Sequence, residues 1–158
     1  MSDRAPASIT IGGTLPLILL SSLVAAIEID NGRADWEGEP VEEGAIESGQ
    51  ILEVFATELR GGIFEDIECF CLQHKLPFVR SSASCVGVFG PERAVYTGDG
   101  APSYFELNEN DEVVLTRAEL SNLGGFDAAG AYFDAAEFTP PPLTIVAEGE
   151  TGTALLDA

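Results

Sequence analysis

Short hydrophobic runs alternate with polar turns along most of the chain, and their spacing switches between that of a strand and that of a helix. Isoleucines that alternate with small polar residues predict a strand over residues 7–11, and the two glycines after it predict a turn. Thr14 is a suitable N-cap and Pro16 fits a first helical turn, so a helix is predicted over residues 15–30. Its apolar residues occupy more than one face, which indicates cover on two sides.

The middle of the chain predicts two strands and a second helix. Residues 34–38 predict a short strand with Trp36 facing inward, and residues 51–57 predict a longer and more hydrophobic one. Apolar residues over 63–75 recur at helical spacing, which predicts a helix that ends before Pro77. Four large side chains of these segments are expected in the core: Trp36, Phe55, Ile67 and Phe70.

The remainder predicts short strands, a third helix and a closing strand. Strands are expected over residues 78–84, 93–97, 104–107 and 113–116, with a turn at 108–111 between the last two. Phe126 and Phe133 each begin a Phe-Asp-Ala-Ala sequence, and their spacing places both on one helical face as a packing stripe. Three prolines end that helix before a last strand over 143–146.

These elements predict a single α+β domain over residues 1–148, followed by a loose tail over 149–158. We expect a mixed or antiparallel sheet with two to three helices. The first half has the order strand, helix, strand, strand, helix, strand, which is that of a ferredoxin-like fold. A chain of 158 residues with 46% hydrophobic residues can bury one core, and a mean hydropathy of +0.17 argues against disorder.

The charge of the chain is its strongest functional signal. There are 27 Asp and Glu residues against 7 Lys and Arg, which gives a formal net charge of −20. Such a charge destabilises the compact state through self-repulsion and exceeds what solubility requires. It indicates a partner or a habitat that compensates for it, and it argues against direct binding of nucleic acid.

The acidic residues concentrate in two segments. Residues 28–47 contain eight acids and one cation, Arg33, and a second group occupies the predicted hairpin around residue 109. In an extended strand Asp35, Glu37 and Glu39 would point to one face at intervals of about 6.6 Å, which is similar to the phosphate spacing of a nucleic-acid strand. The candidate partner-binding residues are Asp35, Glu37, Glu39, Glu42, Glu43, Glu47, Glu106, Glu109, Asp111 and Glu112.

A fixed array of carboxylates can occupy a groove rich in Lys and Arg that is built for DNA or RNA. The sequence therefore predicts a non-enzymatic inhibitor that binds a basic, nucleic-acid-acting protein or effector complex, as a nucleic-acid mimic. Two other interpretations stay open. The acids can form the solvated surface of a protein from a salt-adapted host, or the chain can be an acidic assembly or structural module.

Three cysteines in a chain of this size do not describe a disulfide framework, so we expect a reducing, cytoplasmic setting. The apolar stretch over 15–27 is too short to span a bilayer and lacks the basic start of a signal peptide. Cys69, Cys71, His74 and Cys85 have the residue types of a zinc site. On a helix, however, Cys69 and Cys71 lie about 200° apart, so no metal is predicted.

An enzyme is the alternative of a different class. Cys85 and His74 could form a thiol and its base, and a carboxylate pair such as Glu65 and Asp66 could do acid and base work. Nothing near Cys85 in the sequence would activate the thiol, and a very acidic chain contains carboxylate pairs by chance. No phosphate-binding loop or dinucleotide fingerprint occurs, so no cofactor is predicted.

Several short motifs resemble those of a known group of proteins. They are Ile11-Gly-Gly-Thr-Leu-Pro, Ala25-Ala-Ile ahead of Asp35-Trp36, and Gly62-Ile-Phe-Glu-Asp-Ile-Glu-Cys-Phe-Cys with Pro77-Phe-Val-Arg80. Over residues 8–98 the chain resembles small acidic proteins encoded on bacterial plasmids, phages and other mobile elements. The resemblance implies an accessory role in such an element, where acidic inhibitors of host defence nucleases are common. As the partner we expect a defence or restriction nuclease or a CRISPR effector. The resemblance assigns no functional residue.

Overall fold

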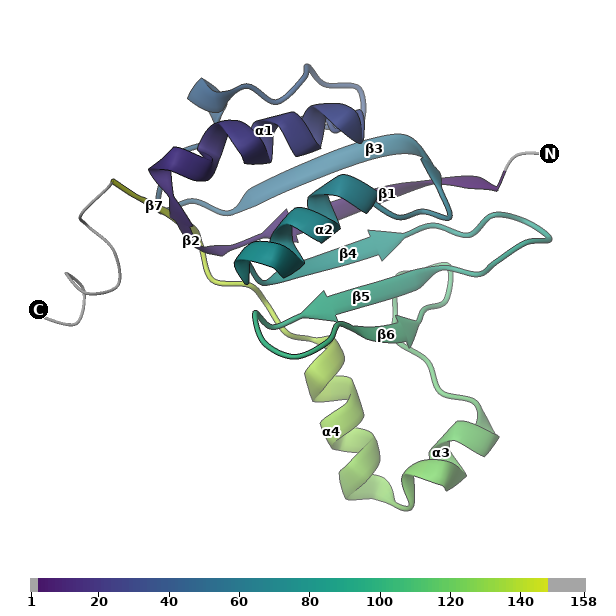
Figure 1. Ribbon diagram of the computed structural model, residues 1–158. Coiled ribbons are helices and arrows are strands. Elements are labelled where there is room, and N and C mark those ends of the chain that lie inside the picture. Colours follow the sequence, from purple (N-terminus) through teal and green to yellow (C-terminus); the bar gives the residue numbers. More distant parts are fainter. Residues whose placement is uncertain (1–2, 148–158) are drawn as a thin grey trace, which may run out of the picture.

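Five strands form an antiparallel sheet in the order β3-β1-β4-β5-β6 (Figure 1). The computed structural model describes residues 3–147. The strands are β1 (Arg4–Ile11), β3 (Leu52–Arg60), β4 (Phe78–Ser82), β5 (Glu92–Tyr96) and β6 (Ser103–Glu106). β3 and β4 lie on either side of β1 and are both antiparallel to it. The predicted α+β class is confirmed.

Two helices, α1 (Leu20–Ile29) and α2 (Glu65–His74), cover one face of this sheet (Figure 1). Leu23 and Ile27 of α1 and Ile67 of α2 are fully buried in the main hydrophobic core between the helices and the sheet. The carboxylate of Asp30, at the end of α1, accepts hydrogen bonds from the backbone N–H groups of residues 66 and 67. It thereby satisfies free donors at the start of α2 and fixes the two helices together.

The C-terminal half adds a helical arm and a second, smaller sheet. Helices α3 (Arg117–Leu123) and α4 (Phe126–Ala136) form an arm that extends below the main sheet in Figure 1. β7 (Leu143–Val146) then pairs in parallel with β2 (Gly13–Pro16). The end of α4 packs on the other face of the main sheet, where Ala136 joins Val95 and Phe105 in a small apolar cluster.

The predicted start of the first helix is wrong. Residues 13–16 form β2, a single 3-10 turn follows at Leu17–Leu19, and α1 begins at Leu20. Thr14 and Pro16 therefore lie in a strand, because pairing with β7 competes successfully with the local helix signals. The expected cover on two sides is present, because α1 packs on the sheet and beside α2. The outer face of α1 stays open, and Ile29 at its end is 70% exposed.

The predicted strand over 34–38 does not form, and with it the ferredoxin-like order is lost. Residues 35–38 make a turn in which the N–H of Gly38 donates to the carbonyl of Asp35 over 3.0 Å. An aspartate at the first position and a glycine at the fourth are typical of a type I turn. Of the four predicted core residues, Ile67 and Phe70 are buried and Phe55 is half-buried, but Trp36 is 44% exposed.

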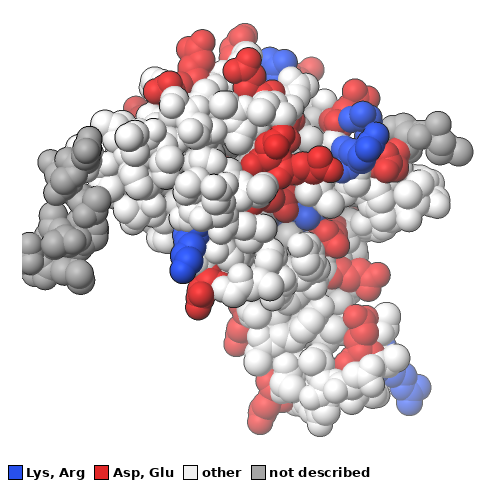
Figure 2. Space-filling model, viewed as in Figure 1, with Lys and Arg blue, Asp and Glu red and all other residues white. Residues whose placement is uncertain are grey.

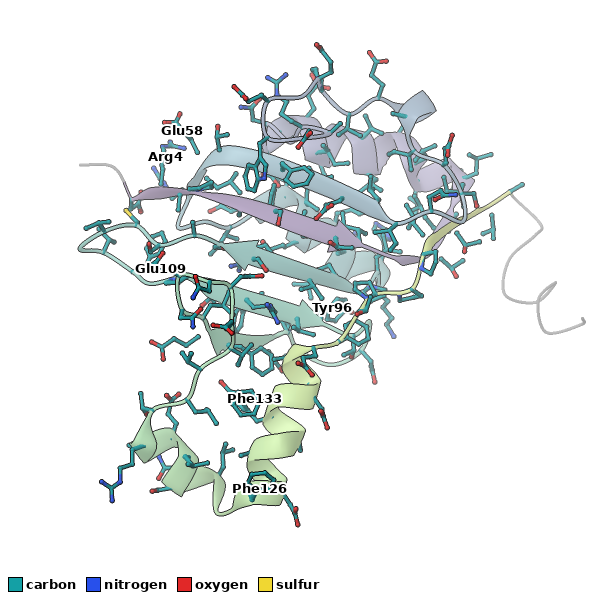
Figure 3. All side chains as sticks on the ribbon, turned by 180° about the vertical axis from the view of Figure 1, so that it is seen from behind. Arg4, Glu58, Tyr96, Glu109, Phe126 and Phe133 are labelled. Carbon is teal, nitrogen blue, oxygen red and sulfur yellow. The ribbon has the colours of Figure 1, made fainter. Side chains whose placement is uncertain are left out.

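The third expected helix exists, and a fourth precedes it. Residues 113–116 were expected to form a strand, but the only pairing there is a single bridge between Leu107 and Val113 within the described chain. Thr116 instead caps α3 through a capping box with Glu119. The predicted packing stripe on α4 is also wrong, because Phe126 is 91% exposed at the tip of the arm (Figure 3). The expected tail over 149–158 lies outside the described residues.

Candidate functional site

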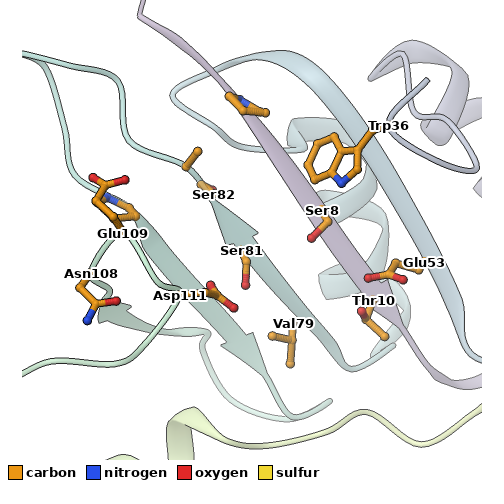
Figure 4. A pocket seen from close by; sticks show the side chains of 13 residues that line it. Ser8, Thr10, Trp36, Glu53, Val79, Ser81, Ser82, Asn108, Glu109 and Asp111 are labelled. Carbon is orange, nitrogen blue, oxygen red and sulfur yellow. The ribbon is translucent and has the colours of Figure 1, made fainter. Parts of the chain in front are cut away.

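The face of the main sheet that is turned away from α1 and α2 is only half covered. The end of α4 covers β5 and β6, where Val95 and Phe105 are buried. The other half, over β3, β1 and β4, forms the floor of a groove of about 470 Å³ (Figure 4). We call it the sheet groove. It brings together side chains from six separate segments of the chain.

The floor of the sheet groove is polar because of the alternation along its strands. Ser8 and Thr10 of β1 face the groove, whereas Ile9 between them is buried beneath the helices. Ser8 pairs across the sheet with Ser81, and Thr10 pairs with Val79, which also face the groove. Small hydroxyl side chains thus occupy positions that would be apolar if another layer of the protein covered them.

Trp36 forms one wall of the groove, and the loop that carries it is fixed to the edge of β3. Arg33 and Phe55 exchange two backbone hydrogen bonds of 2.7 and 2.9 Å, which add this loop to the sheet. The Asp35 carboxylate accepts a 2.8 Å hydrogen bond from the N–H of Trp36, and the turn closes at Gly38. The indole then lies against the ring of Phe55 with centroids 4.9 Å apart.

The loop over residues 108–111 forms the opposite wall. The Asn108 carboxamide oxygen accepts from the N–H groups of Asn110 and Glu112 at 2.8 and 3.0 Å, which fixes the turn. The guanidinium of Arg93 donates to the Asp111 carbonyl and carboxylate and to the carbonyl of Ala136. This arginine therefore joins the loop to the end of α4.

The sheet groove is acidic. Its lining includes the carboxylates of Glu53, Glu109 and Asp111 and no lysine or arginine. Asp111 is already paired with Arg93 over 3.3 Å, and Glu109 accepts a hydrogen bond from the Ser84 hydroxyl. Figure 4 shows Glu53 and Glu109 on opposite sides of the serine floor. The site therefore favours a cation that can reach both sides.

The structure separates most of the acids that the sequence grouped. Glu109 and Asp111 line the sheet groove, while Asp35, Glu37 and Glu39 are exposed on the loop that carries Trp36. The remaining candidates lie elsewhere: Glu42 and Glu43 line a second hollow beside α1, Glu47 a smaller one, Glu106 a hollow beside β6, and Glu112 binds the Asn108 side chain. Because residues 35–38 turn, the regular 35-37-39 array does not form.

Sequence reasoning missed most of the groove. The sequence patterns do not single out Glu53, Ser8 or Ser81, and they place Trp36 in the core. A signal was available for the floor, since small polar residues alternate with isoleucines over residues 7–11. It shows that one face of β1 is not buried, but it cannot show which distant loops stand beside that face.

Few of the surface carboxylates have a cationic partner. Two arginines, Arg80 and Arg93, make the three ion pairs found within residues 3–147. Figure 2 shows carboxylates over the loop above α1, around both helices and along the α3–α4 arm, so they do not form one compact patch. The acidity on this face is therefore spread over several elements, and the sheet groove is one of several hollows that carboxylates line.

Arg80 is the one deeply buried cation within residues 3–147, and its contacts are with groups of the core. Arg80 is 1% exposed and pairs with Glu68 over 3.1 Å and with Glu92 over 3.0 Å. It also donates to the hydroxyl of Ser82. Burial raises the pKa of Glu68, although the positive charge of Arg80 opposes that shift. Arg80 and Glu68 lie under α2, on the opposite side of the sheet from the groove, whereas Ser82 also lines the groove.

The candidate catalytic pair is not assembled. His74 precedes β4 and contacts the ring of Phe70 in a tilted arrangement with ring centroids 4.5 Å apart, whereas Cys85 follows β4 at its other end. Cys71 is fully buried, and its burial raises the pKa of the thiol. Glu65 and Asp66 lie in the first turn of α2, where the helix dipole favours acids. No group of three metal-ligating side chains occurs in the described part of the chain.

No protein-family model, curated protein or solved structure matches this chain. Between residues 3 and 147, no helix has both the length and the apolar character needed to cross a membrane.

Proposed function

We propose that this protein is a non-catalytic binding protein that inhibits a basic protein acting on nucleic acid. The main support for this proposal is that a folded domain has many more carboxylates than cationic partners for them. Self-repulsion among these charges destabilises the free protein. A partner surface rich in lysine and arginine removes that repulsion on binding and is attracted over a long range, which accelerates association.

Inhibition follows from competition for the same cations. Lysines and arginines that bind DNA or RNA phosphates would be occupied by carboxylates of this protein, with charge-assisted hydrogen bonds of similar strength. Because residues 35–38 form a turn, the proposed competitor does not reproduce a regular phosphate spacing. It would act through total charge and through the loops that border the sheet groove. The resemblance to mobile-element proteins is consistent with a defence nuclease or a CRISPR effector as the partner.

The alternatives predict different behaviour. A surface adapted to high salt would bind no particular basic protein and would gain stability from salt alone. An assembly module would bind copies of itself or other structural proteins, without an effect on nucleic-acid binding. An enzyme has no observation in its favour, since the thiol and the imidazole lie at opposite ends of β4.

A pull-down tests the proposal. The folded protein is the bait in a bacterial lysate freed of nucleic acid, at low and at high ionic strength, and the same chain unfolded by heat is the control. We expect the folded bait alone to retain a basic protein whose binding to labelled DNA or RNA it then blocks. Equal retention by the unfolded chain, or a captured protein that still binds its nucleic acid, would refute the proposal.

A further inference from the structure

We propose that the sheet groove binds an extended, arginine-bearing segment of a partner protein, with one guanidinium group on the indole of Trp36 between Glu53 and Glu109. This inference rests on the proposed function, because it specifies where and through which chemistry the basic partner is held. Three features of the groove support it: the wall that carries Trp36, the polar floor and the charge of the lining.

The groove wall formed by Trp36 is preorganised for binding. Trp36 is 44% exposed although the backbone that carries it is fixed by the pairing of Arg33 with Phe55 and by the turn at Gly38. The ring contact with Phe55 fixes the indole from one side. A rigid, exposed tryptophan loses little conformational entropy when a ligand stacks on it, and this is typical of binding surfaces. Its position beside the groove is visible in Figure 4.

The floor of the groove indicates a polar occupant. α4 covers the apolar half of this sheet face, where Val95 and Phe105 are buried, and stops short of the half that carries Ser8 and Ser81. The uncovered half is therefore polar, and no further layer of protein is needed to bury it. Hydroxyl groups can donate to backbone carbonyls and accept from N–H groups of a chain laid across them.

The charge of the lining selects a cation, and the indole selects arginine. Glu53 and Glu109 have no cationic partner among the ion pairs of residues 3–147, and the lining contains no lysine or arginine. A guanidinium is planar, stacks on an indole and can donate to carboxylates on two sides at once. An ammonium group offers a point charge without the stacking surface. A second copy of this chain brings a charge of −20 and is repelled.

Trp36 makes the experiment direct because it is the only tryptophan of the chain. Its fluorescence is recorded while the protein is titrated with short peptides that differ only at a central Arg, Lys or Gln, and with spermidine as a free polycation. We expect saturable binding of the Arg peptide, several-fold tighter than that of the Lys peptide, and no saturable change with the Gln peptide. Equal affinities for the Arg peptide, the Lys peptide and spermidine would overturn the inference.

Matched variants separate the groove from general charge. Glu53→Gln should weaken binding of the Arg peptide about 3-fold, since a partly exposed ion pair is lost. Glu58→Gln is the control, because Glu58 is exposed on the same strand but does not line the groove. Trp36→Phe, followed by calorimetry, should weaken the preference for Arg over Lys. Equal effects of Glu53→Gln and Glu58→Gln would overturn the inference.

The two proposals can fail separately. If the peptide binds as expected but no nucleic-acid-acting protein is captured and inhibited, the proposed function fails and the groove assignment stands. If such a partner is inhibited equally by the original protein and by the Trp36→Phe/Glu53→Gln variant, the groove assignment fails and the proposed function stands.

Discussion

The indole of Trp36 lies against the phenyl ring of Phe55, with ring centroids 4.9 Å apart and ring planes inclined by 60°. This contact joins the acidic loop over residues 33–40 to the edge strand of the sheet, and it leaves 44% of Trp36 exposed. Trp36, which the sequence pattern places in the core, therefore forms the wall of a groove instead.

Truncation of Phe55 should loosen that wall. Phe55→Ala removes half-buried apolar surface and the support of the indole, so we expect a loss of about 1–3 kcal/mol in the free energy of unfolding. The emission of Trp36 should shift to longer wavelength and its anisotropy should fall. Phe126→Ala is the matched control, because Phe126 is 91% exposed and should change stability by less than about 0.5 kcal/mol. An unchanged Trp36 emission in Phe55→Ala would contradict the contact.

Removal of Arg80 should be among the most destabilising substitutions. Arg80→Ala leaves the carboxylate of Glu68 under α2 without its cation, and we expect a loss of about 3–5 kcal/mol in urea-induced unfolding. The double variant Arg80→Met/Glu68→Leu should recover most of that loss, since no buried charge remains. Arg117→Ala, at an exposed arginine of α3, provides the control. A small effect of Arg80→Ala would show that the ion pair is not formed.

Stability should rise as the pH is lowered from 7 toward about 4.5. Burial raises the pKa values of Glu68 and Asp30, so the folded state binds more protons than the unfolded state over this interval. A raised pKa of an acid favours folding at low pH and opposes it as the pH rises. Falling net charge acts in the same direction. Melting temperatures that stay constant or fall between pH 7 and 5 would contradict this, and Glu68→Gln should flatten the profile.

Two glycines should respond to alanine in opposite ways. At Gly12 an added Cβ would lie 1.7 Å from the carbonyl oxygen of Pro141, so Gly12→Ala should separate the segment before β7 from β1 and lower stability by more than about 2 kcal/mol. At Gly130, in α4, no neighbouring atom is near, and Gly130→Ala should stabilise by about 0.5–1 kcal/mol. Chemical denaturation measures both. A Gly12→Ala protein as stable as the original would show that the close approach is absent.

The sequence predicts the strands of the main sheet well, but it does not predict the small second sheet of β2 and β7. The strands over 78–84 and 93–97 and the helix over 63–75 form with small shifts in their bounds, because local periodicity and burial agree there. β2 could not be found in this way. Its partner β7 lies far away in the sequence, with Leu143 opposite Gly13, and Thr14 and Pro16 favour a helix locally. Tertiary pairing decides such a segment.

Two other errors had signals in the sequence. Asp35 and Gly38 have the spacing of a type I turn, whereas the alternation of acids around Trp36 favours a strand over the same residues. Thr116 and Glu119 have the spacing of a capping box, which the structure uses to begin α3. The groove itself has no such signal, because its walls come from loops that only the folded sheet brings to face each other.

The most direct test of the account is displacement of nucleic acid from the captured partner. A labelled DNA or RNA fragment bound to that partner is titrated with the original protein and with two variants of equal charge, Glu37→Lys/Glu39→Lys beside Trp36 and Glu58→Lys/Glu137→Lys away from it. All four positions are exposed, so folding should be preserved.

We expect the original protein to release the fragment in proportion to complex formed. The Glu37→Lys/Glu39→Lys variant should release it much less effectively than the Glu58→Lys/Glu137→Lys variant. A partner that keeps its nucleic acid while bound to this protein would contradict the account.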